Sequence, residues 1–189
     1  MRVCPIQVGQ TMAPAFLRSI IALLILLCPV GASAELAWWL TARFAPSANA
    51  IEGIPIGRID GTWVAASPLA VLPLPPEASA PGESVREHDG FFSLEHDFDH
   101  DGDPEKAIVG VYRTRENQTG RFLVILNGGP KPSQVHAVFT IEGAAGFSVL
   151  YHEKGEVSWS TCMECDVFSI VRFSAGVYRL EHFSCEDCG

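Results

Sequence analysis

The acidic segment between residues 97 and 105 holds the side chains best suited to chemistry. Carboxylates alternate at Asp97, Asp99 and Asp101, and Gly102 follows them. A hard dication such as Ca²⁺ takes roughly six to eight oxygen ligands, and a loop that turns every second side chain inward supplies them. Gly102 permits the tight turn that closes such a loop. The segment predicts a calcium site whose candidate ligand residues are Asp97, Asp99, Asp101, Asp103 and Glu105.

Two other interpretations fit parts of this segment. Asp, Gly and Pro are ordinary turn residues, so a solvated acidic turn is the plain alternative. An EF-hand loop needs a bidentate Glu at its twelfth position and a helix on each side. That position is Ile108, and the mostly apolar residues 106–112 are typical of a strand. The pattern favours a calcium loop that leads into a strand.

Two C-x-x-C motifs form a second candidate cluster. Cys162 and Cys165 precede a predicted hairpin, and Cys185 and Cys188 follow it. With Ala175 at the centre of the turn, Cys165 lies opposite Cys185 and Cys162 lies opposite Cys188. The hairpin therefore brings four sulfur atoms to one end.

Three chemistries suit these sulfur atoms. Four thiolates with paired C-x-x-C spacing hold a tetrahedral Zn²⁺ ion. Cross-strand cysteines also form disulfides, which an oxidising compartment favours. A redox-active motif needs a positive neighbour or a helix N-terminus to lower the thiol pKa, but the neighbours are acidic: Glu164, Asp166, Glu186 and Asp187. The sequence leaves zinc and disulfides open and makes a redox role the weakest of the three.

The first 34 residues have the pattern of a secretory signal peptide. Arg18 precedes the apolar run 20–27, and the small residues 32–34 form a cleavage site. The run is too short for a comfortable membrane span, and no later segment is long enough to form one. We expect an exported protein, periplasmic or secreted. An uncleaved anchor and a translation start at Met12 stay open.

The net charge of the chain limits the classes of partner that it can bind. Without residues 1–34, the chain keeps 11 basic and 22 acidic residues, a formal net charge of −11. This balance argues against nucleic acid and anionic membranes and suits divalent cations or basic partners. The sequence also lacks the Gly-x-Ser-x-Gly, phosphate-loop and His-Glu-x-x-His motifs of common enzymes.

The chain divides into a signal peptide (1–34), a Pro/Ala-rich N-terminal arm (35–85) and a β domain (86–189). Short turn-rich breaks separate the predicted strands, which implies antiparallel neighbours. The predicted fold is mainly β, an antiparallel meandering sheet or sandwich with a C-terminal cysteine-bracketed hairpin. The predicted strands are 91–95, 106–113, 121–127, 135–141, 147–152, 156–160, 166–173 and 177–183.

Placed before a strand, residues 96–109 resemble the calcium loop of FG-GAP/VCBS-type repeats. The matching ligand positions are Asp97, Asp99, Asp101 and Glu105, with Glu105 in place of the usual Asp. The resemblance implies that the backbone carbonyl of Asp103 is a further ligand. The whole chain is also similar to small exported bacterial proteins that carry one such loop.

The expected function is therefore an exported, calcium-stabilised binding or structural module that binds a protein or a glycan. Its C-terminal hairpin would be stapled by zinc or by disulfides. The alternatives are a periplasmic enzyme, either a hydrolase or a thiol oxidoreductase, and a metal-handling protein.

Overall fold

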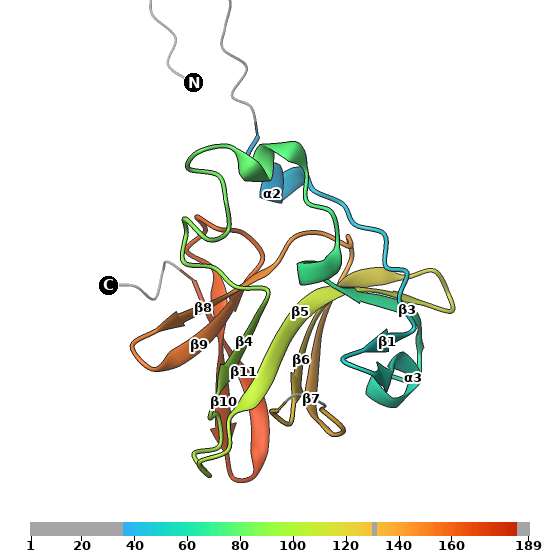
Figure 1. Ribbon diagram of the computed structural model, residues 1–189, viewed down its shortest axis with the longest axis vertical. Helices are drawn as coiled ribbons and strands as arrows, with labels where there is room; N and C mark the ends of the chain where they lie inside the picture. The colour runs from blue at the N-terminus through green and yellow to red at the C-terminus, as the bar shows by residue number, and fades with distance from the viewer. Residues whose placement is uncertain (1–35, 130–131, 185–189) are drawn as a thin grey trace, which may run out of the picture. The chain divides into compact units, whose positions relative to one another are not determined.

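The described residues form two antiparallel sheets of five and four strands and a two-stranded ribbon (Figure 1). The computed structural model describes residues 36–129 and 132–184, so the predicted signal peptide lies outside the described residues. The described residues all belong to one compact unit, Leu36–Gly189. The mainly β, antiparallel fold predicted from the sequence is confirmed.

The five-stranded sheet is built around β5. The strand order is β3-β5-β6-β7, and β4 also pairs with β5. Both faces of β5 are covered, because Val109 and Val111 lie in one buried cluster and Ile108 and Tyr112 lie in another. A strand buried on both faces reads as a continuous apolar run, as this one does. The strands are β3 (Trp63–Pro68), β4 (Ser93–His96), β5 (Glu105–Thr114), β6 (Thr119–Leu126) and β7 (Val135–Glu142).

The four-stranded sheet is a meander with the strand order β11-β10-β9-β8. The predicted register of its last hairpin, with Ala175 at the centre of the turn, is wrong by one residue. Ile170 pairs with Glu181 and Ser174 pairs with Val177, because Ala175 and Gly176 form a two-residue turn with φ angles of 52° and 76°. The strands are β8 (Val149–Glu153), β9 (Glu156–Ser160), β10 (Phe168–Ser174) and β11 (Val177–Phe183).

The two sheets share one core. Val109 and Leu123 of the five-stranded sheet lie in the same buried cluster as Trp159 of the four-stranded sheet. The backbones also meet, since Phe91 N–H donates to the Leu150 carbonyl and Leu150 N–H donates to the Phe91 carbonyl, each at 2.8 Å. The hairpin of β4 and β5 is thereby tied to both sheets.

Residues 36–85, predicted as an arm, contribute to this domain. β3 pairs with β5, Trp63 stacks on Tyr112 with ring centroids 4.9 Å apart, and Trp38 and Trp39 are buried. No helix in the described ranges is long and apolar enough to cross a membrane. The other elements are α2 (Trp38–Thr41), β1 (Ala50–Ile51), β2 (Ile54–Pro55), α3 (Ile56–Ile59), η1 (Leu69–Val71) and η2 (Pro76–Ser79).

Candidate metal centre

The acidic segment forms the connection of the β4–β5 hairpin. His96 ends β4, Glu105 begins β5, and the two residues pair across the hairpin. The structure thus confirms a strand directly after the acidic loop. The chain reverses within the loop at His100 and Gly102, whose φ angles are 61° and 97°. Positive φ suits glycine, which has no Cβ to clash, and supports the role assigned to Gly102.

Three of the five predicted carboxyl groups come together. One oxygen each of Asp97, Asp99 and Glu105 lies within 4.8 Å of the others. Asp101 and Asp103 are exposed and lie outside that group. The Asp101 carboxylate instead accepts a hydrogen bond from Asp103 N–H at 2.8 Å. The side chains that converge are therefore two from the loop and one from the first residue of β5.

Backbone hydrogen bonds hold the two loop carboxylates in place. The two oxygens of Asp97 accept from Asp101 N–H and Gly102 N–H, both at 3.1 Å. One oxygen of Asp99 accepts from Asp101 N–H at 3.2 Å. An ionised carboxylate has about four lone-pair sites. These bonds therefore fix the carboxylates and leave lone pairs for a cation.

Glu105 is the buried member of the cluster, with an exposed fraction of 3%. Its carboxylate accepts from Phe98 N–H at 2.9 Å. Burial raises the pKa of Glu105, the Phe98 hydrogen bond opposes that rise, and the charge of Asp99 adds to it. Two carboxylates less than about 5 Å apart repel by about 3 kcal/mol at an effective dielectric constant of about 20. A dication between the three groups would remove this repulsion.

The second sheet supplies aromatic side chains beside the cluster. The Tyr178 ring contacts Phe98 and His136, with centroid separations of 6.3 and 5.9 Å. Burial, followed by the charges of Glu105 and Asp99, raises the pKa of Tyr178. Asp99, His136 and Tyr178 also line a cavity of about 370 Å³. Tyr178 belongs to no motif in the sequence, and only the register and packing of β11 reveal its position.

His96 lies beside the carboxylate cluster but is not one of its three members. Its ring lies 4.8 Å from that of Phe98 and 5.1 Å from that of His152, centroid to centroid. Burial, and then the charges of His152 and His100, lowers the pKa of His96. The oxygen atoms therefore remain the candidate ligands, and oxygen is the donor that Ca²⁺ prefers.

The described cysteines are paired within one motif. Cys162 and Cys165 form a disulfide, with their Cα atoms 5.6 Å apart. Cys162 is buried and Cys165 is exposed. The predicted disulfides across the hairpin are therefore wrong for Cys162 and Cys165, because these two residues are bonded to each other. Cys185 and Cys188 lie outside the described residues. A four-thiolate zinc site would require the reduced form of the Cys162–Cys165 pair.

No protein-family model, curated protein or solved structure matches this chain. The function proposed below therefore rests on the sites themselves.

Proposed function

We propose that this chain is an exported binding or structural module whose β4–β5 hairpin is ordered by Ca²⁺. The observation that carries the proposal is the convergence of Asp97, Asp99 and Glu105 within 4.8 Å. All three donors are carboxylate oxygens, and one of them is buried next to its neighbours. Hard oxygen donors at this density suit Ca²⁺ better than the softer transition metals.

The converging carboxylates can supply part of a calcium coordination shell. Asp101 and the backbone carbonyl of Asp103 are the further ligands that the resemblance to the FG-GAP/VCBS loop implies. Water completes the roughly six to eight positions. Mg²⁺ demands a smaller and nearly octahedral shell and gives up its water reluctantly, so an irregular loop favours Ca²⁺.

Calcium bound in this way stabilises the native state by mass action. The three carboxyl groups are adjacent only in the folded chain, because a hairpin and a buried strand end bring them together. At a free calcium concentration about 100 times Kd, the free energy of unfolding rises by about 2.7 kcal/mol. For a domain of this size, the melting temperature then rises by roughly 5–10 °C.

The test is thermal unfolding of residues 35–189 in calcium and in chelator. We expect the wild type to melt higher in calcium and native mass spectrometry to show one bound calcium ion. Asp99→Ala removes a converging carboxylate and should abolish the rise. Asp103→Ala is the matched control, because its side chain lies outside the cluster and its carbonyl is retained. A full calcium response in Asp99→Ala would contradict the proposal.

Export and a binding role are part of the same proposal. The Cys162–Cys165 disulfide supports an oxidising compartment, and the acidic net charge of −9 disfavours nucleic acid as a partner. The partner we propose is a protein or a glycan. The intact mass of the unreduced protein completes the test. Two disulfides lower this mass by four hydrogens. Bound zinc together with four reduced thiols would instead favour the metal-handling alternative.

A further inference from the structure

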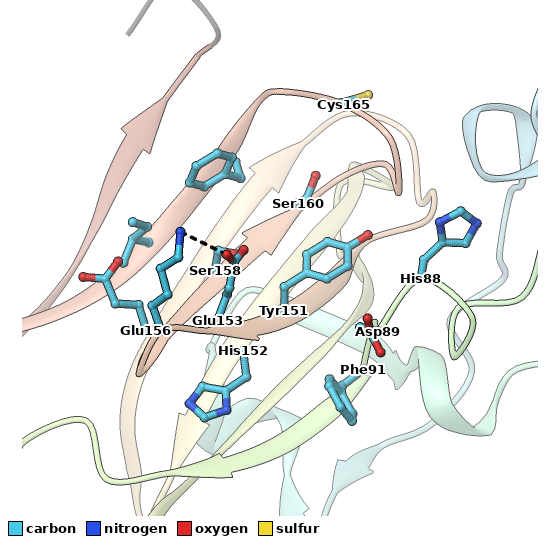
Figure 2. A pocket seen from close by; sticks show the side chains of 13 residues that line it. His88, Asp89, Phe91, Tyr151, His152, Glu153, Glu156, Ser158, Ser160 and Cys165 are labelled. Atoms are coloured by element: carbon cyan, nitrogen blue, oxygen red, sulfur yellow. Dashed lines mark ion pairs between the residues drawn. The ribbon is translucent and has the colours of Figure 1, made fainter. Parts of the chain in front are cut away.

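A second cavity lies on the face of the four-stranded sheet that points away from the shared core. Its volume is about 700 Å³, and Ser158 and Ser160 of β9 line it. Val157 and Trp159, which alternate with them, belong to the core. Successive side chains of a strand point to opposite faces. The cavity is therefore built on the outer face of the sheet, as Figure 2 shows.

Aromatic rings form the floor and one wall of this cavity. In Figure 2, Tyr151 lies at the centre, with His88, Asp89 and Phe91 along one side. The Tyr151 hydroxyl donates to the Met163 carbonyl at 3.2 Å, which fixes the ring. The Phe91 side chain is 46% exposed, although its backbone is bonded to β8. The cavity thus presents aromatic surface to solvent, and the Tyr151 ring within it is held in place.

One carboxylate in the cavity lacks a partner. Glu153 pairs with Lys154 at 3.2 Å, and Glu156 pairs with Arg172. Within residues 36–129 and 132–184, the Asp89 carboxylate has neither a hydrogen bond nor an ion pair. Asp89 points toward the cavity from the loop before β4 (Figure 2). The cavity therefore has unneutralised negative charge beside its aromatic rings.

The loop that carries Asp89 is held in one conformation. Asp89 has a φ angle of 54°, which Asp tolerates better than most residues. Gly90 N–H donates to the Val85 carbonyl at 2.8 Å. A Cβ at Gly90 would lie 2.6 Å from Val149 and 2.8 Å from Val85, so the backbone there packs tightly. The backbone that carries the Asp89 carboxylate therefore needs no reordering when a ligand binds.

We propose that this cavity binds the alkylammonium group of a small organic amine. An ammonium group is attracted to the faces of Tyr151 and Phe91 and forms a charge-assisted hydrogen bond with the Asp89 carboxylate. The negative charge of the chain favours a cation over an anion of the same size. This inference goes beyond the calcium module, because none of these groups belongs to the Asp97, Asp99 and Glu105 cluster.

The test compares a diamine with a neutral molecule of the same length. Putrescine and 1,4-butanediol are titrated into residues 35–189 in calcium, at about 0.15 M salt to screen nonspecific attraction. Backbone amide chemical shifts in NMR spectra report the site and the affinity. We expect shifts at Asp89, Phe91 and Tyr151, and binding of putrescine about tenfold tighter than that of the diol.

Three variants test whether putrescine binding depends on the Asp89 charge and the Phe91 ring. Asp89→Asn keeps the shape and tolerates the positive φ, and it should weaken putrescine binding about tenfold. Phe91→Ala should weaken it while leaving the backbone pairing with β8 intact. Glu116→Gln, an exposed acid in the turn after β5, makes the same charge change outside the cavity and should leave the affinity unchanged.

Three results would overturn the inference. They are equal binding of putrescine and the diol, an unchanged affinity in a folded Asp89→Asn variant, and shifts at these residues with glucose but not with putrescine. The last result would assign the cavity to neutral sugars. A melting curve of each variant shows whether it is folded.

Discussion

Replacing Glu105 by Gln should have opposite effects with and without calcium. Glu105 is 3% exposed and lies within 4.8 Å of the Asp97 and Asp99 carboxylates. Gln keeps the shape and the carbonyl oxygen that accepts from Phe98 N–H, but it carries no charge. Without calcium the variant loses two repulsive interactions of about 3 kcal/mol each at an effective dielectric constant of about 20. Relaxation of the exposed loop reduces that benefit.

We expect calcium-free Glu105→Gln to be more stable than the wild type by about 1–3 kcal/mol, which raises its melting temperature by roughly 2–10 °C. In saturating calcium the order reverses, because the variant has lost an anionic ligand. Thermal unfolding monitored by circular dichroism, in chelator and across a calcium titration, measures both effects. The reasoning is refuted if the variant is less stable in chelator and keeps the calcium response of the wild type.

Two further predictions concern Tyr151 and the disulfide. Burial, with a smaller contribution from the charge of Glu164, raises the pKa of Tyr151 to about 12, above the roughly 10 of an unfolded chain. Between pH ~10 and pH ~12 the native state therefore keeps a Tyr151 proton that the unfolded state has lost. The stability that comes from neutral Tyr151 is complete below pH ~10 and is lost as the pH rises towards ~12. Absorbance titration of tyrosinate should show a step near pH 12 that Tyr151→Phe lacks. Replacing both Cys162 and Cys165 by Ala opens a short loop and should lower the free energy of unfolding by about 2 kcal/mol in oxidising buffer. Denaturant unfolding should show most of that difference disappear under reducing conditions.

The central strands and the acidic loop could be predicted from local sequence. The predicted strand 106–113 corresponds to Glu105–Thr114 in the structure, because its continuous apolar run is flanked by turn residues. The acidic loop falls directly before that strand for the same reason. Local pattern was sufficient here, since both the buried run and the turn residues are short-range signals.

Features that depend on tertiary packing could not be predicted in this way. β3 falls within the predicted Pro/Ala-rich arm, yet it is a strand that ends with Pro68 at the edge of the sheet, where proline is tolerated. The predicted β10–β11 register assumes a three-residue turn, Ser174 to Gly176, whereas the structure has a two-residue turn of Ala175 and Gly176. One residue decides which face each side chain occupies. The proximity of Tyr178 to Asp99 follows only from that register and from the packing of the two sheets.

The β4–β5 connection has little hydrophobic stabilisation of its own. It contains eight residues, and of these only Phe98 is a buried apolar side chain, with an exposed fraction of 5%. The remaining order comes from backbone N–H groups that donate to Asp97, Asp99 and Glu105. These bonds are strongest when the carboxylates are ionised, but ionised carboxylates so close together repel. In our proposal Ca²⁺ resolves this conflict, because it neutralises the carboxylates without protonating them. The bound ion would then stabilise the hairpin where Phe98 and Tyr178 bring the two sheets into contact.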